Sequence, residues 1–229
     1  MDSQTRKQVI NYLGDFVTPS RLQKIQQVLS QRTRHLTVVL EDIYQPHNAS
    51  AVLRSCECFG VQDVHIIENR YDYEINPEVD MGASKWLSLH RYRDGEFNIG
   101  ACLNHLKQEG YQLVATSPHE HDFNPVGLPL DKPVAILFGT EQEGLSAQAL
   151  QAADFFMRIP MAGFTESFNI SVSAAICLFE LTNRLKKSNI PWQLSEEQYD
   201  ELHLEWLSAS IKTPELLIKR FLETRQAKH

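Results

Sequence analysis

The stretch VAILFGTEQEGLSAQALQAA, residues 134–153, joins two different local patterns through a polar loop. Its first five residues are apolar and have the length of a buried strand, whereas residues 146–153 follow a helical period with Ser146 as the expected N-cap. Gly139 and Gly144 bracket the loop between them. A buried strand that leads through a short loop into a helix is the unit from which α/β proteins with parallel sheets are built.

The same alternation recurs along most of the chain. Apolar runs rich in β-branched residues predict strands at 36–40, 63–68, 86–92, 111–117, 134–139 and 155–160. Segments with a helical period lie between or after them at 48–60, 98–110, 146–153 and 171–187. We therefore predict an α/β domain at residues 36–187, with a mostly parallel sheet and flanking helices.

Both ends of the chain are predicted to be helical extensions of this domain. A Thr-Pro pair precedes the first and third of the predicted helices, and Ser195 with Gln198 forms a capping box before the second. These helices are expected at 18–32, 195–207 and 213–225. The pattern predicts an N-terminal arm at residues 1–35, a C-terminal tail at 188–229 and a hinge at 188–193.

Composition is typical of a soluble protein of the cytoplasm. The chain has 229 residues, of which 42% are hydrophobic, and this is enough for a sizeable core. No apolar run is long enough to span a membrane, and the first residues do not resemble a signal peptide. The four cysteines form no C-x-x-C pair, as expected of reduced thiols. The glycosylation patterns at Asn48 and Asn169 therefore need another explanation.

Charge alone leaves the partner open. The net charge of −7 argues against a nucleic acid. However, residues 1–35 and 210–229 are basic, whereas the chain between them is acidic. Solvated helix surfaces and an RNA-binding footprint explain these basic ends equally well.

Ligand sites in open α/β sheets lie beyond the carboxyl ends of the strands. Three segments at such positions are unusual: EDIYQPHNASAVLR (41–54), FGTEQEGLS (138–146) and IPMAGFTESFNISVS (159–173). None contains a dinucleotide, P-loop or nucleophile-elbow signature. Each has an ordinary explanation when taken alone, with Asn48 or Ser171 as a helix cap and Arg54 paired with Glu57. Their joint placement at three strand ends favours a common site.

A metal site is not expected. The run His119-Glu120-His121 has no third ligand in its loop, and such a run more often forms a solvated turn.

The three unusual segments resemble the three motifs of the SPOUT superfamily of RNA 2′-O-ribose methyltransferases. The resemblance covers about residues 35–187 and is carried by residues 48–54, 136–146 and 159–175. LTVVLEDIYQPHN (36–48) and GASKW (82–86) also resemble the branch of this superfamily that methylates guanosine 18 in the D loop of tRNA. The resemblance implies an enzyme that moves the methyl group of S-adenosylmethionine to a ribose 2′-hydroxyl, without a metal.

The resemblance also implies an assembly and a set of site residues. Members are homodimers with a trefoil knot near the C-terminal end of the α/β domain, and their active sites lie at or near the dimer interface. Residues implied to bind the cofactor are Thr116, Gly139, Ile159 and Phe168, the last standing where a leucine is expected. Residues implied to form the catalytic site are Arg54, Asn48, Glu141, Ser167 and Asn169.

Two roles stay open for Arg54, because a guanidinium is protonated at physiological pH. It is either the base that removes the 2′-proton or the group that binds the adjacent phosphate and the developing alkoxide. If tRNA is the substrate, the basic ends are expected to supply cations for its phosphates. They are Arg6, Lys7, Arg21, Lys24, Arg32, Arg34, Lys212, Lys219, Arg220 and Arg225. The alternatives are a ribosomal-RNA ribose methyltransferase and a non-catalytic RNA-binding protein of the same fold.

Overall fold

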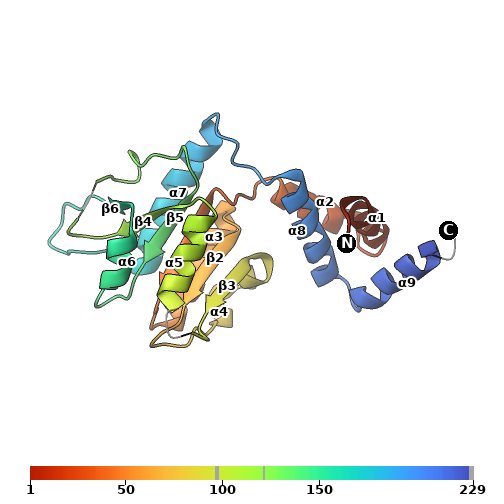
Figure 1. Cartoon of the computed structure of the whole chain (residues 1–229), viewed down its shortest axis with the longest axis horizontal. Helices are drawn as coiled ribbons and strands as arrows, with labels where there is room; N and C mark the ends of the chain where they lie inside the picture. Colours follow the sequence, from red (N-terminus) through yellow and green to blue (C-terminus); the bar gives the residue numbers. More distant parts are fainter. Residues whose placement is uncertain (96–97, 121, 227–229) are drawn as a thin grey trace. The chain divides into compact units, whose positions relative to one another are not determined.

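The structure is a computed structural model that describes residues 1–95, 98–120 and 122–226. The chain forms two compact units, one of residues Thr33–Trp192 and one of Met1–Arg32 together with the chain from Gln193 onwards. Figure 1 shows the sheet of the first unit and the helices of the second. Among the described residues, no helix has both the length and the apolar character needed to cross a bilayer.

A six-stranded parallel sheet forms the centre of the first unit, in the order β3-β2-β1-β5-β4-β6 (Figure 1). Its strands are β1 Leu36–Glu41, β2 Asp63–Ile67, β3 Ser88–Tyr92, β4 Gln112–Thr116, β5 Val134–Phe138 and β6 Phe155–Met157. The predicted α/β class and parallel sheet are confirmed. Several strands are shorter than predicted. Trp86, for example, lies in the 3-10 helix η1 Ala83–Trp86 and not in β3.

Helices pack on both faces of this sheet (Figure 1). They are α3 Pro46–Phe59, α4 Pro77–Asp80, α5 Asn98–Gln108, α6 Ala147–Ala152 and α7 Ile170–Lys187. The predicted cap is confirmed at Ser146, whose side chain accepts from the N–H of Ala149. Gly60 ends α3 with φ of 84°, a conformation that favours glycine.

In the motif segments, neither Asn48 nor Ser171 is the helix cap that the ordinary explanation of each segment requires. Gln45 precedes α3, so Asn48 lies inside the first turn of the helix, and Asn169 instead of Ser171 caps α7. α3 begins at Pro46, two residues before Asn48, whereas the Asn169 side chain accepts from the N–H of Ser171 and so starts α7 two residues earlier than a cap at Ser171 would.

The core divides according to the alternation of side chains along β1. Leu36, Val38 and Leu40 belong to the cluster that includes residues of α3 and α7, whereas Val39 belongs to the cluster with α5 and α6. All four side chains are at most 1% exposed. Burial of one such side chain contributes about 1.5–3 kcal/mol, so this alternation fixes the register of the strand firmly.

The side of the sheet on which successive strands are added changes between β1 and β5. From β1 the chain proceeds to β2 and β3 on one side, while β5, β4 and β6 occupy the other. Leu40 pairs with Phe138 in the parallel ladder, so the loops that follow β1 and β5 leave the sheet beside each other. Such a switch point is the preferred ligand position in open α/β sheets.

The second unit is helical and contains both ends of the chain. Its helices are α1 Ser3–Gly14, α2 Pro19–Leu29, α8 Glu196–Ser210 and α9 Pro214–Gln226. The predicted Thr18 cap of α2 and the capping box of Ser195 and Gln198 are confirmed. Thr213 directly precedes α9, as the Thr-Pro pattern predicts, with φ of 54° and its hydroxyl donating to the carbonyl of Lys212. No particular helix was predicted at α1, which Asp2 caps through the N–H of Thr5.

Candidate active site

Asn48 joins the three motif segments by hydrogen bonds. Its side chain is on the first turn of α3 and is 3% exposed. The amide nitrogen donates to Oε1 of Gln45 at 3.1 Å and to Oε1 of Glu141, in the loop after β5, at 2.6 Å. The amide oxygen accepts from Nδ2 of Asn169, in front of α7, at 3.1 Å. A buried amide with two donor and one acceptor contacts is well satisfied, so these bonds define its orientation.

Asn169 links this junction to the start of α7. Its Oδ1 accepts from the N–H of Ser171 at 2.8 Å and from the Ser171 hydroxyl at 2.6 Å, while its Nδ2 reaches Asn48. One side chain therefore caps a helix and contacts the junction at once. Because the two amide atoms are needed for different tasks, neither serine nor aspartate supplies both.

Gly139 is required by the close approach of two backbone segments. A Cβ at this position would lie 2.2 Å from the carbonyl carbon and oxygen of Gly144 and 2.3 Å from the nitrogen of Leu145. The loop is closed by two bonds between Thr140 and Gly144, whose N–H groups each donate to the other's carbonyl at 3.0 and 3.1 Å. Gly144 itself has φ of 72°, which favours glycine. This closed loop carries Glu141 to Asn48.

The other residues implied to bind a cofactor lie at the end of β4 or after β6, and these two strands are neighbours in the sheet. Thr116 ends β4 and donates its hydroxyl to the carbonyl of Leu137 at 2.8 Å. Ile159 packs against the core, whereas Phe168 is 42% exposed in a segment, 162–169, that is exposed throughout. These loops offer backbone groups, small polar side chains and an aromatic ring. Such a surface fits a cofactor that has both positively and negatively charged groups, because such a ligand does not need a strongly charged pocket.

Arg54 is not brought to the Asn48 junction within one chain. It is exposed on α3, six residues after Asn48, which places the two side chains about 120° apart around the helix. Within the described part of the chain, no hydrogen bond or ion pair holds its guanidinium. Ser167 is likewise exposed. The structure therefore assembles Asn48, Glu141 and Asn169, and leaves Arg54 and Ser167 open to a ligand or to another chain.

The cations of the N-terminal arm are largely engaged within the helical unit. Arg6 forms ion pairs with Glu201 at 3.1 Å and Glu197 at 3.9 Å, both on α8. Lys7 pairs with Glu196 on the same helix. Arg32 has no exposed surface, and its guanidinium lies over the ring of Trp206, 5.0 Å from the centroid. A fully buried guanidinium serves packing and is not available to an RNA phosphate.

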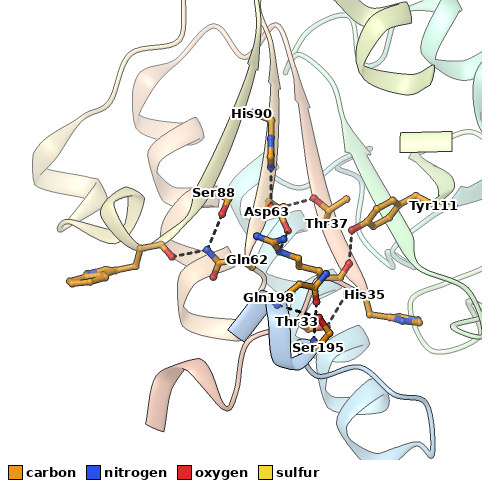
Figure 2. A network of polar contacts seen from close by, with 12 residues as sticks. Thr33, His35, Thr37, Gln62, Asp63, Ser88, His90, Tyr111, Ser195 and Gln198 are labelled. Carbon is orange, nitrogen blue, oxygen red and sulfur yellow. Dashed lines mark hydrogen bonds and ion pairs between the residues drawn. The ribbon is translucent and has the colours of Figure 1, made fainter. Parts of the chain in front are cut away.

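Arg34 pairs with Asp63, the first residue of β2, which Figure 2 shows in a polar network with Thr37 and His90. Nε of Arg34 lies 3.1 Å from Oδ2 of Asp63, whose Oδ1 contacts Nε2 of His90 at 2.9 Å. The hydroxyl of Tyr111 donates to the Arg34 carbonyl at 2.6 Å, and Thr37 donates to the Asp63 carbonyl at 2.7 Å. The Arg34 side chain is 29% exposed, so the charge of this residue is mainly compensated inside the protein.

Other predicted cations remain at the surface. Lys24 on α2 and Arg220 on α9 are exposed, as are Arg21 and Lys219, although Lys219 lies 3.9 Å from Glu223. They belong to the accessible part of the predicted footprint, as does the exposed Lys212.

Within the described ranges, no group of His, Cys, Asp and Glu side chains suits a metal ion. His121, part of the run considered above, lies outside those ranges.

A model of the SpoU rRNA Methylase family matches residues 35–179. The chain belongs to the SpoU methylase family. A relative from Borreliella burgdorferi, named tRNA (guanosine(18)-2′-O)-methyltransferase, is 42% identical over 93% of this chain and 95% of its own length. A protein of the same name from Thermus thermophilus is 36% identical over 83% of this chain and 97% of its own. The crystal structure of the A. aeolicus TrmH/SpoU tRNA modifying enzyme superposes with a TM-score of 0.73 at 28% identity, covering 85% of this chain and 98% of that one.

Sequence reasoning missed two residues of the segment that leads from β1 to the Asn48 junction. Gln45 accepts from Asn48, and Asp42 turns the chain after β1 with φ of 51°. The Asp42 carboxylate accepts from the N–H groups of Asn69 at 2.6 Å and Arg70 at 2.9 Å. An aspartate directly after a strand is the available signal, because this residue tolerates the left-handed region and bonds to nearby backbone.

Proposed function

We propose that this protein transfers the methyl group of S-adenosylmethionine to the ribose 2′-hydroxyl of a tRNA nucleotide, guanosine 18 in the D loop. The observation that carries the proposal is the Asn48 junction, where hydrogen bonds of the buried Asn48 side chain join the segments after β1, after β5 and before α7. A scaffold without chemistry has no need for this arrangement. The full-length relatives named for this reaction support the choice of tRNA and of position 18.

S-adenosylmethionine supplies an activated methyl group whose leaving group is a neutral thioether. We assign its binding to the loops at Thr116, Gly139 and Ile159–Phe168, where backbone and small polar groups predominate. Because no acid is needed for this leaving group, the protein has two tasks. It aligns the 2′-oxygen and it assists removal of the 2′-proton.

Asn48, Glu141 and Asn169 perform the first task by fixing the surface on which the ribose is held. Arg54 performs the second by binding the neighbouring phosphate and stabilising the alkoxide, which its exposed guanidinium and the absence of a protein partner among the described residues favour. The proton then passes to a phosphate oxygen or water. Ser167, which is exposed two residues before Asn169, adds a hydroxyl to the surface on which the ribose is held.

The separation of Arg54 from Asn48 supports a homodimer with the active site at or near its interface. α3 and α7 pack against each other, and α7 exposes two apolar side chains: Val172 is 44% and Phe179 57% exposed, with the Phe179 ring 6.1 Å from that of Phe59 on α3. Neighbouring exposed apolar side chains of this kind mark interaction surfaces. A second copy that covers them would bring Arg54 close to groups of its partner. A trefoil knot at the C-terminal end of the domain remains a prediction from the resemblance.

In this proposal residues 36–187 carry out methyl transfer, and the segments 1–35 and 188–229 bind RNA in the cytoplasm. The exposed cations Arg21, Lys24, Lys219 and Arg220 supply the affinity for phosphates.

Methyl transfer from labelled S-adenosylmethionine to unmodified tRNA, followed by mapping of the 2′-O-methyl group, tests the proposal. We expect the label at guanosine 18, and its loss in Arg54→Ala with S-adenosylmethionine binding retained. Arg54→Lys separates the two roles of the residue, since a lysine that restores most of the rate contradicts dependence on the guanidinium. Transfer to ribosomal RNA and to no tRNA would refute the assignment.

A further inference from the structure

Two exposed tyrosines contact each other beyond the carboxyl ends of β1 and β2. Tyr44 follows β1 and is 64% exposed, whereas Tyr71 follows β2 and is 39% exposed. Their ring centroids are 4.9 Å apart and the ring planes meet at 67°, an edge-to-face arrangement. In this geometry one ring presents its edge to the other, so aromatic faces remain open to a ligand. Packing of the core does not account for a pair with so much exposed surface.

The backbone under the two rings is held in place. The carboxylate of Asp42 accepts from the N–H groups of Asn69 and Arg70, which joins the segment before Tyr44 to the segment before Tyr71. Beyond Tyr71, the N–H of Asn76 donates to the hydroxyl of Ser50 on α3 at 2.8 Å. The pair is therefore preorganised, which lowers the entropic cost of binding.

The same segments are tied to the candidate active site. Tyr44 directly precedes Gln45, whose side chain accepts from Asn48. On the other side, the guanidinium of Arg70 binds Oε2 of Glu143 at 2.5 Å, in the loop that carries Glu141. The aromatic pair is thus connected to the Asn48 junction through Gln45, which follows Tyr44, and through Arg70, which precedes Tyr71.

We propose that Tyr44 and Tyr71 form a stacking subsite for a nucleobase of the RNA substrate, next to the nucleotide that is methylated. The inference rests on the proposed function, because a ribose held at the Asn48 junction carries its own base and adjacent nucleotides to the surrounding surface. Single-stranded loop bases bind proteins by stacking on aromatic side chains, and this stacking tolerates any base. The subsite would therefore contribute to the affinity for RNA and to its positioning. It would select an unstacked base of any identity and would not distinguish one sequence from another.

The test measures tRNA affinity and steady-state kinetics of the full chain carrying alanine, leucine or phenylalanine at Tyr44 and at Tyr71. We expect each alanine to weaken tRNA binding and raise KM for tRNA about ten-fold, equivalent to about 1.4 kcal/mol, with kcat at saturating tRNA nearly unchanged. Phenylalanine should retain wild-type affinity, whereas leucine, which is apolar but has no aromatic face, should behave like alanine. Val126→Ala, at a 66% exposed apolar residue away from the site, is the matched control.

Abasic tRNAs identify the contacted base. One abasic position near the methylated nucleotide should weaken binding to the wild type and cause no further loss in Tyr44→Ala. Unchanged S-adenosylmethionine affinity and thermal unfolding temperature show that the variants are folded; a parallel fall in either would overturn the proposal in favour of a structural role.

Three further results would overturn it: alanine variants with wild-type KM and affinity, leucine variants as good as phenylalanine, or abasic tRNAs that show no coupling. Failure of the proposed function would give a different result in these assays. In that case the wild type itself transfers no methyl group to tRNA, and the same variants are then measured on the RNA that it does methylate.

Discussion

The closed loop after β5 makes Gly139→Ala the sharpest test of the site. The added Cβ would lie 2.2 Å from the carbonyl carbon and oxygen of Gly144. Ordinary contacts between non-bonded heavy atoms lie at about 3.5–4.0 Å, so the overlap exceeds 1 Å. The obstructing atoms belong to the backbone and cannot rotate away. The loop must therefore move as a unit, and Glu141 moves away from Asn48 with it.

Overpacking of a well-packed site costs about 1–3 kcal/mol, and contact with immobile backbone places Gly139→Ala at the upper end. For a chain of this size, 3 kcal/mol corresponds to a fall of about 6–12 °C in the unfolding temperature. We also expect weaker S-adenosylmethionine binding, measured by calorimetry. Gly127→Ala is the control, because its Cβ would meet only Oδ1 of Asn124, at an ordinary 3.6 Å. If both variants melt with the wild type and Gly139→Ala binds the cofactor within two-fold, the reasoning about this loop is wrong.

Other expectations follow from single contacts. Burial lowers the pKa of His65 from 6.5 to about 3, so the unfolded chain gains a proton there well before the folded chain does as the pH falls. The free energy of unfolding should therefore fall by about 2 kcal/mol between pH 6.5 and 4.5, and urea titrations of His65→Gln should show a smaller fall. Asn169→Ser should lose methyl transfer and destabilise the protein less than Asn169→Ala, because serine still caps α7 but does not reach Asn48, whereas alanine loses both contacts and about 1 kcal/mol more for the missing cap. Lys24→Ala should reduce the salt dependence of tRNA binding by about one phosphate contact, whereas Lys7→Ala, which only breaks an internal ion pair, should leave it unchanged.

Much of the fold is predictable from local patterns. β1 and β5 are apolar runs whose neighbours on both faces are helices, so their composition alone identifies buried parallel strands. Loop glycines such as Gly139 are visible as well. Helix starts are less predictable, as Asn48 shows. α3 begins at Pro46, two residues before Asn48, whose side chain instead bonds to residues 93 and 121 positions away.

The RNA-binding footprint was the least predictable part, because the availability of a cation depends on its tertiary partners. Arg32 and Lys24 have the same formal charge and lie near each other in the sequence. The first is buried against an aromatic ring of α8, whereas the second is exposed on α2. No pattern within residues 1–35 reveals that α8 supplies the acidic partners of α1. The charge map of the sequence therefore overestimates the cations that face a ligand.

At the Asn48 junction the same hydrogen bonds contribute to the stability of the fold and to the alignment of the proposed active site. Its three bonds make Asn48 a structural residue by burial, yet two of the partners, Glu141 and Asn169, are exposed and face the surface where a ribose would lie. An aspartate at position 48 would place a carboxylate 2.6 Å from that of Glu141 and remove the donor between them, at the expense of both stability and alignment. The amide is the side chain of this size that holds a carboxylate and a second amide together without adding charge. The double variant Asn48→Asp/Glu141→Gln restores a donor between positions 48 and 141, and comparing it with Asn48→Asp separates the two contributions. If the double variant recovers stability but not the rate of methyl transfer, the charge of Glu141 itself takes part in the reaction.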